Sequence, residues 1–146
     1  VLVPMVEDAT TAAAVVESAR YPSGGGDGIR GCAHPFVRGS GWGVDSDYLT
    51  KCREDLLVMV QVETARGVEA IPEICAVEGV DAVFLGPFDL SADIGRMGMF
   101  NDPVVAALIG RAERAVVEYG RSGRAEESPC VLAGFRLPGR DLRKMF

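Results

Sequence analysis

The feature that most constrains this chain is an alternation of short apolar segments with helix-length segments, in which two of the apolar segments end in an acid. LLVMVQVE ends at Glu63 and VDAVFLGPFD ends at Asp89, with one helix-sized stretch between them. Strands joined in this way pair in parallel, so both acids are expected at the carboxyl edge of one sheet. Neighbouring parallel strands lie about 4.8 Å apart. One hard cation, which prefers oxygen ligands, could therefore bind both carboxylates.

The same alternation continues through the whole chain and predicts its fold class. Apolar segments predict strands over residues 1–6, 56–62, 80–86 and 130–134. Capping residues and apolar spacing predict helices over 9–20, 47–53, 64–77 and 103–120. The stretch 86–95 is predicted to be a turn, and 141–146 the start of another helix. Four strands alternating with helices predict a parallel α/β sheet with right-handed crossovers.

Composition limits the kinds of partner that the chain can have. With 146 residues, of which 48% are hydrophobic, the length fits about one globular domain. The net charge of −6 and the lack of a Lys/Arg run argue against a nucleic-acid or anionic-membrane surface, and favour a small-molecule ligand. No apolar run approaches the roughly 20 residues of a membrane span, and the first residues do not resemble a signal peptide. A cytoplasmic location is expected.

The remaining unusual residues favour structural roles over chemistry. The four cysteines contain no CxxC motif, so they are expected to be reduced structural thiols. Cys32 and His34 are close in sequence, but no second Cys/His pair follows that would complete a metal site. The glycines over 24–28 lack the GK[ST] of a phosphate-binding P-loop. Trp42 is expected to have a packing role.

Gln61 and Glu63 are predicted to point into the same site, because residues two apart on a strand share a face. The Gln61 amide could then hydrogen-bond oxygen atoms of a substrate. Each acid also has a simpler interpretation: Glu63 could cap the helix that begins near Thr64, and Asp89 could be an ordinary loop acid.

The sequence Gly86-Pro87-Phe88-Asp89 has a separate predicted use in binding an anion. Gly86 allows close approach of the backbone, and Pro87 fixes the turn but has no N–H to donate. The N–H groups of Phe88 and Asp89 are then free donors for a carboxylate. Ser91 is expected to shape the turn and not to act as a nucleophile, because no histidine lies near it in sequence.

Four segments occur in a recognisable order: VLVPMVEDA, SARYP with GIRG, LLVMVQVET, and VEGVDAVFLGPFDLSADIG. Together they closely resemble the HpcH/HpaI family of metal-dependent pyruvate aldolases, which are relatives of the citrate lyase β subunit. The resemblance implies a partial (β/α)₈ TIM barrel of the phosphoenolpyruvate/pyruvate-domain type. Residues 1–146 would be a single partial domain with strands four to seven, lacking the first three strands and the last. The full-length family implies a homo-oligomer, usually a trimer or hexamer.

The resemblance also implies roles for individual residues. Glu63 and Asp89 fall on the family's metal ligands, for Mg²⁺, Mn²⁺ or Co²⁺, and Gln61 falls on a catalytic and substrate-binding position. The turn Gly86-Pro87-Phe88-Asp89 would hold the carboxylate of a 2-oxo acid. The implied reaction is lyase cleavage of a 4-hydroxy-2-oxo acid to pyruvate and an aldehyde through a metal-stabilised pyruvate enolate.

Two alternatives to this reaction remain open at the level of sequence. The family also uses an arginine, a histidine and an aspartate that would precede Val1, so the isolated chain could be a non-catalytic truncated remnant. It could also be a citrate-lyase-like acyl-CoA lyase, although no basic adenine-binding surface is visible in the sequence.

Overall fold

The sheet of this protein contains four parallel strands in the order in which they occur along the chain. The computed structural model describes residues 1–22, 28–121 and 130–134. The strands are β1 (Leu2–Val3), β2 (Met59–Val62), β3 (Ala82–Leu85) and β4 (Val131–Gly134). Gln61 of β2 lies opposite Phe84 of β3, and Phe84 lies opposite Ala133 of β4. The predicted parallel α/β sheet is therefore confirmed.

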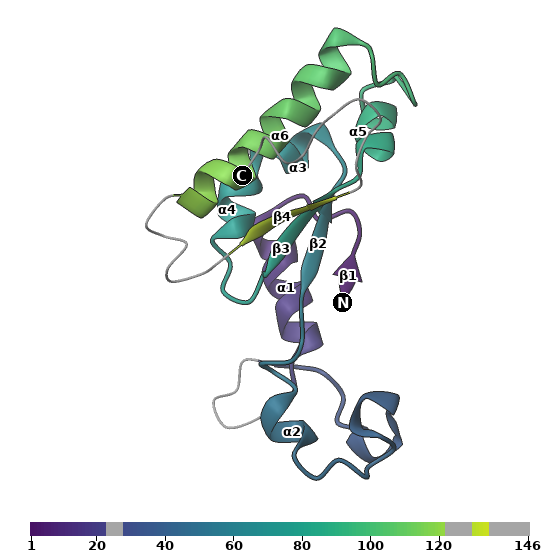
Figure 1. The fold of residues 1–146 in the computed structure, drawn as a ribbon, viewed down its shortest axis with the longest axis vertical. Helices are drawn as coiled ribbons and strands as arrows, with labels where there is room; N and C mark the ends of the chain where they lie inside the picture. The colour runs from purple at the N-terminus through teal and green to yellow at the C-terminus, as the bar shows by residue number, and fades with distance from the viewer. Residues whose placement is uncertain (23–27, 122–129, 135–146) are drawn as a thin grey trace.

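Helices connect the strands, and the long helix near the C-terminus packs against two of the strands, β3 and β4 (Figure 1). The α-helices are α1 (Ala9–Ala19), α2 (Tyr48–Lys51), α3 (Ala65–Glu69), α4 (Ile71–Cys75), α5 (Pro87–Asp93) and α6 (Pro103–Arg121). Helix α6 contacts α3, α4 and α5 as well as β3 and β4, and α4 also contacts α1. None of the described helices is long and apolar enough to cross a membrane.

The hydrophobic core lies between the sheet and these helices. It contains fully buried side chains from strands and helices alike: Val60, Val62, Val83, Ile71, Ile74, Val105 and Val116. The other face of the sheet carries Met59, Gln61 and Phe84, which are only partly buried. Because side chains alternate along a strand, Glu63 lies on the same face of the sheet as Gln61. That face therefore has room for a polar site.

The predicted first strand, 1–6, is shorter in the structure and ends at Val3. Pro4 has no N–H to donate to the ladder, and Met5 has a left-handed backbone with φ of 58°. The chain nevertheless stays beside β2, because the Val6 N–H donates to the Gln61 carbonyl at 3.0 Å.

Two other segments also differ from the prediction. The helix predicted over 64–77 is divided at Ala70 into α3 and α4. Pro72 lies in the first turn of α4 and has no N–H with which to continue α3. The stretch predicted as a turn over 86–95 contains helix α5, which begins at Pro87. Proline is favoured at the first position of a helix, so the same residue that suggested a turn starts α5.

Residues 28–55, which we call the arm, lie at the end of α1 away from α6 (Figure 1). The arm contains two short 3₁₀ helices, η1 (His34–Phe36) and η2 (Arg38–Ser40), and helix α2. Trp42 is 67% exposed, so the prediction of a packing role was wrong. The Gly-rich stretch at 24–27 and the helix expected at 141–146 lie outside the described residues.

Candidate functional site

Glu63 follows β2 directly and lies at the centre of the candidate site. Its side chain is only 6% exposed. One carboxylate oxygen, Oε2, accepts a hydrogen bond from the Met5 N–H at 2.9 Å, and the other, Oε1, accepts one from Nε2 of Gln61 at 3.0 Å. A carboxylate has about four lone-pair positions, so these two donors fix its orientation without using all of them. Glu63 therefore keeps acceptor capacity for a further ligand.

Met5 reaches Glu63 through an unusual backbone conformation. Its φ of 58° lies in the left-handed region, which costs about 1–2 kcal/mol for a residue with a Cβ. The conformation directs the Met5 N–H at the Glu63 carboxylate, while the Met5 side chain is exposed. Sequence reasoning missed this residue, because a methionine carries no signal for a left-handed backbone.

Gly86 lies directly against the Glu63 side chain. A Cβ added to Gly86 would be 2.6 Å from Oε1 of Glu63 and 2.8 Å from its Cγ, distances that real Cβ atoms do not show. Only glycine therefore allows this approach. The close backbone approach that the sequence predicted at Gly86 is made toward the Glu63 side chain.

Asp89 lies in the first turn of α5, next to Glu63. Burial raises the pKa of Glu63 above its ordinary value, and the Met5 hydrogen bond opposes this. The negative charge of Asp89 and a side-chain hydrogen bond with it raise the Glu63 pKa further. A like charge this close disfavours the ionised form of Glu63. The structure thus brings Gln61, Glu63 and Asp89 into one cluster, and their roles in it stay a prediction.

The first turn of α5 supplies the backbone groups that were predicted to bind an anion. Pro87 is the first helical residue, and the N–H of Leu90 is the first to bond back, to the Gly86 carbonyl at 2.9 Å. The N–H groups of Phe88 and Asp89 precede it and have no partner within the helix. Both N–H groups belong to the helical turn that carries Asp89, and their use in binding an anion stays a prediction.

Ser91 has a structural environment. Its hydroxyl is fully buried, donates to the Phe88 carbonyl at 2.6 Å and accepts the Gly98 N–H at 2.9 Å. These bonds tie the loop after α5 to the first turn of that helix. The Phe88 ring packs edge-on against Phe100 of the same loop, with ring centroids 5.8 Å apart. Ser91 thus shapes this segment, as the sequence predicted.

The donor set fits a hard divalent cation with few protein ligands. Among the described residues, no three His, Cys, Asp or Glu side chains gather closely enough to form a metal site by themselves. In the same ranges, no lysine or arginine is ion-paired with Glu63 or Asp89. Magnesium-like ions often use only one or two carboxylates and keep other positions for substrate and water. Two adjacent carboxylates with no cationic partner in the described part of the chain match that pattern.

The cysteines lie away from this cluster. All four are free thiols, and Cys75 and Cys130 are buried. A hydrogen bond with Cys130, together with burial, raises the pKa of the Cys75 thiol, so it stays protonated. His34 stacks on the ring of Tyr48 at 6.4 Å between centroids. These environments agree with the structural roles expected for the thiols.

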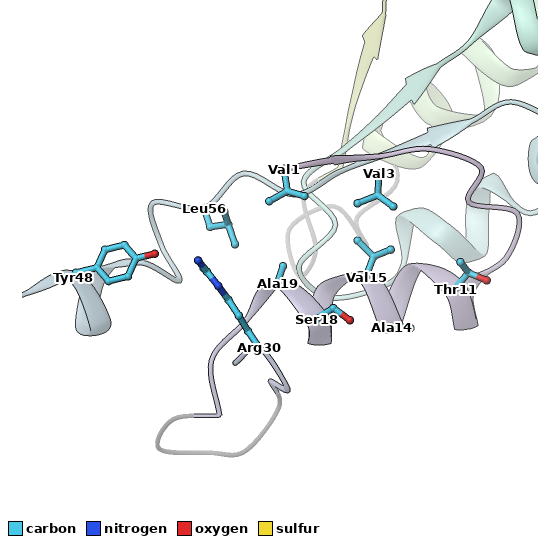
Figure 2. Close-up of a pocket in the computed structure, with 10 residues that line it drawn as sticks. All are labelled: Val1, Val3, Thr11, Ala14, Val15, Ser18, Ala19, Arg30, Tyr48 and Leu56. Carbon is cyan, nitrogen blue, oxygen red and sulfur yellow. The ribbon is translucent and has the colours of Figure 1, made fainter. Parts of the chain in front are cut away.

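A groove of about 660 Å³ lies elsewhere, on the outer side of edge strand β1 (Figure 2). Val1 and Val3 of the β1 segment face Val15 and Ala19 of α1 across it. Its lining is largely apolar and includes none of Gln61, Glu63 and Asp89. The groove therefore lacks the chemistry of the candidate site.

The fold and the cluster together define a class of protein. Parallel α/β proteins build their sites at the carboxyl ends of the strands, where Glu63 and Asp89 lie. The family model for HpcH/HpaI aldolase/citrate lyase matches residues 1–133. The chain belongs to this family.

Curated relatives from two bacteria are similar to most of the chain. The 4-hydroxy-2-oxo-heptane-1,7-dioate aldolase of Escherichia coli is 44% identical over 124 residues, which cover 85% of this chain and 45% of that protein. The hydroxypyruvate/pyruvate aldolase of Cupriavidus necator is 39% identical over 132 residues, which cover 90% of this chain and 48% of that protein. The chain therefore spans about half the length of the curated relatives it matches.

Solved structures show the same likeness in three dimensions. An HpcH/HpaI aldolase/citrate lyase family protein from Burkholderia cenocepacia superposes with a TM-score of 0.75 and 32% identity, covering 91% of this chain and 57% of that one. The HpcH/HpaI aldolase from Desulfitobacterium hafniense superposes with a TM-score of 0.64 and 27% identity, covering 92% of this chain and 56% of that one.

Proposed function

We propose that this chain carries the metal- and pyruvate-binding part of an aldolase that cleaves 4-hydroxy-2-oxo acids to pyruvate and an aldehyde. The observation that carries the proposal is the contact between the buried Glu63 and the exposed Asp89 at the carboxyl ends of β2 and β3. The names of the two curated relatives, both aldolases, support the same reaction class.

Glu63 and Asp89 would hold the divalent cofactor, which we propose to be Mg²⁺, Mn²⁺ or Co²⁺. Such an ion, when bound, acts as a Lewis acid toward the oxygens of a 2-oxo acid and so favours the enolate that cleavage produces. The hydrogen bonds from Met5 and Gln61 fix the Glu63 carboxylate before any ligand arrives. Preorganised ligands lose less freedom on binding, so they support affinity.

The remaining site residues would bind and orient the substrate. The Gln61 side chain lies beside Glu63, and its amide nitrogen could donate a hydrogen bond to a substrate oxygen. The N–H groups of Phe88 and Asp89 would hold the carboxylate of the 2-oxo acid, with Gly86 and Pro87 shaping that turn. The proton-transferring groups and an arginine are expected from the part of the relatives that this chain does not span.

The architecture that we propose is a single partial domain, residues 1–146, with strands four to seven of a (β/α)₈ barrel. The sequential parallel order of β1 to β4 supports it, as does the apolar groove beside β1, where a preceding βα unit would lie. We also propose a homo-oligomer in the cytoplasm that does not bind nucleic acid or membranes. The net charge of −6 and the four free thiols support these assignments.

Calorimetric titration of manganese into the chain, with and without pyruvate, tests the proposal. We expect pyruvate to strengthen manganese binding, because the ion and the N–H groups of α5 would hold the same ligand. Glu63→Gln and Asp89→Asn should each abolish this effect, since each removes a charged oxygen ligand.

Glu73→Gln is the matched control, because Glu73 is an exposed acid on α4 outside the cluster. It should bind manganese and pyruvate like the unaltered chain. A folded chain that binds no manganese would refute the metal site. Binding of manganese and pyruvate without release of pyruvate from a 4-hydroxy-2-oxo acid would identify a non-catalytic remnant.

A further inference from the structure

Helices α3 and α5 follow neighbouring strands, and each begins next to one acid of the candidate site. Glu63 lies two residues before Ala65, the first residue of α3, and Asp89 lies in the first turn of α5. Both helices contact α6. Figure 1 shows them at the end of the sheet toward which the β2 arrow points. The position of one helix relative to the other therefore decides how the two acids meet.

Asp93, the last residue of α5, joins the two helices directly. Its carboxylate oxygen Oδ2 accepts a hydrogen bond from the Ala65 N–H at 2.8 Å. Because Ala65 is the first residue of α3, its N–H has no partner within that helix. The hydrogen bond thus satisfies a free donor at the start of α3 with an acceptor from the end of α5.

The contact between the two acids and this hydrogen bond have matching spacing on the two segments that they join. Thr64 has an extended backbone, with φ of −128° and ψ of 156°, so Glu63 and Ala65 are about 6.6 Å apart along the chain. Asp89 and Asp93 are four residues apart on one face of α5, which corresponds to a rise of about 6 Å. A single contact would leave α5 free to rotate about it. Two contacts at the same spacing fix both its position and its direction.

We propose that Asp93 is a positioning residue for the metal site, because it holds α5 against the start of α3 and so places Asp89 where one cation can bind it together with Glu63. This inference rests on the metal binding proposed above and adds a residue that supports the ligands without touching the ion. Asp89 and Asp93 are both exposed, so burial does not hold the Asp89 side chain in place. Groups that orient metal ligands typically contribute about 10–100-fold to metal affinity.

Manganese affinity, measured by calorimetry, tests the role of the hydrogen bond. Asp93→Ala removes the acceptor, and we expect manganese to bind about tenfold more weakly. Asp93→Asn keeps an acceptor oxygen in the same place without the charge. Its affinity should stay within about twofold of that of the unaltered chain, because the lost charge is exposed and screened by salt.

Ala65→Pro removes the other half of the same hydrogen bond and keeps the Asp93 carboxylate. Proline is favoured at the first position of a helix, and Thr64 already has the extended backbone that a following proline requires, so α3 should still form. We expect the same loss of manganese affinity as for Asp93→Ala. The double variant Asp93→Ala/Ala65→Pro should lose no more than either single variant, because both remove one interaction. If Asp93→Ala does not fold, Ala65→Pro still tests the bond.

Asp81→Ala is the matched control. Asp81 precedes β3, and its Oδ2 accepts the Val58 N–H at 2.7 Å, at the opposite end of the same two strands. This variant should lose stability toward urea as Asp93→Ala does, but bind manganese like the unaltered chain. The electron paramagnetic resonance spectrum of bound manganese reports the arrangement of its ligands. It should change in Asp93→Ala and stay the same in Asp81→Ala, which separates positioning from a general loss of stability.

The results that would overturn the proposal can be told apart. If the unaltered chain binds no manganese, the metal site itself fails, and the role of Asp93 fails with it. If the unaltered chain binds manganese and both Asp93→Ala and Ala65→Pro bind it equally well, with unchanged spectra, only the positioning role fails. An equal loss of affinity in Asp93→Asn and Asp93→Ala would assign the effect to the charge of Asp93 and would also refute positioning.

Discussion

Glu63 shows how much of the candidate site depends on atoms that are not themselves expected to bind a ligand. A backbone N–H from Met5, a side-chain amide from Gln61 and the bare backbone of Gly86 surround its carboxylate. Each of these neighbours limits where the carboxylate can point. The orientation of Glu63 is therefore set before a cation binds, and a change in any neighbour should weaken the site without removing a ligand.

Gly86→Ala tests this dependence. The added Cβ would lie 2.6 Å from Oε1 of Glu63, so the carboxylate must shift. We expect manganese binding to weaken by about tenfold or more, since a distorted support shell typically costs 10–100-fold in metal affinity. Calorimetry measures this change directly.

Gly110→Ala is the control for Gly86→Ala. Gly110 lies within α6, and an added Cβ would meet only the flexible end of Arg114, at 3.3 Å. This variant should be more stable by about 1 kcal/mol, because alanine favours a helix more than glycine does, and its manganese affinity should not change. Equal manganese affinities for the two variants would contradict the steric explanation.

The raised pKa of Glu63 predicts a pH dependence for the metal-free chain. The folded state holds the Glu63 proton more tightly than the unfolded state, whose carboxyl has its ordinary pKa of 4.5. This group therefore stabilises the fold fully below pH 4.5, and the contribution is lost as the pH rises through the higher folded pKa. Urea unfolding at several pH values should show a free-energy difference between the unaltered chain and Glu63→Gln that changes over this window.

Glu73→Gln, which changes an exposed acid on α4, is measured alongside as the control for the change in net charge. If the Glu63→Gln difference does not vary with pH, burial does not favour the protonated form of Glu63, and the electrostatic description of the pair is wrong.

At this scale, spacing along the strands indicated which acids lie together. Residues that end adjacent parallel strands must lie near one another, so Glu63, Asp89 and Gln61 were placed together without a structure. Met5 was missed because its contribution comes from a backbone angle that its side chain does not favour. The exposure of Trp42 was not predicted, because large apolar residues are usually buried. Its neighbours along the chain gave no sign of the hydrogen-bonded loop that leaves it exposed.

The helices show a similar limit at the scale of elements. Apolar spacing identified one helical face over 64–77 but could not show that the helix is divided at Ala70. Pro87 was interpreted as a turn residue, although proline is equally suited to the first position of α5. Both differences arise because proline favours turns and helix starts alike, and tertiary contacts decide between them.

Thr64 joins two elements and offers a prediction at this scale. Its hydroxyl oxygen accepts the Gly67 N–H at 3.1 Å as the cap of α3, and its proton is donated to Glu7 at 2.7 Å. Thr64→Ala should lower the free energy of unfolding by about 1–2 kcal/mol, the usual loss for a helix cap. Thr64→Ser keeps the hydroxyl and should recover most of that loss. Urea denaturation of both variants measures the difference; an equal loss in both would show that packing of the methyl group matters more than the cap.

The whole molecule combines a packed sheet-and-helix body with an arm that has little apolar core of its own. Strands β2 and β3 are each paired on both sides, whereas the arm is connected to the body through contacts such as the edge-on packing of Tyr21 and Tyr48. The order of the sheet followed from the alternation of segments in the sequence. The position of the arm could not be predicted, because its irregular segment has no periodic pattern of apolar residues.

This contrast predicts the pattern of amide hydrogen exchange. Amides in β2 and β3 should exchange most slowly, because only opening of the whole body exposes them. Amides of the arm, residues 28–55, should exchange faster, because the arm can open locally. Exchange measured by mass spectrometry at low protein concentration tests this expectation. Equal protection of the arm and of β2 would show that the two parts unfold as one unit.

Nearly all groups of the candidate site come from one continuous segment of the chain, from the start of β2 to the first turn of α5. The Met5 N–H is the one contribution from the chain before this segment. A short stretch of coding sequence thus carries both acids, the amide and the glycine that accommodates them. Genetic recombination can move such a stretch as a unit. In the barrel proposed above, evolution could therefore exchange the surrounding segments, and with them the choice of substrate, while inheriting the acid pair intact.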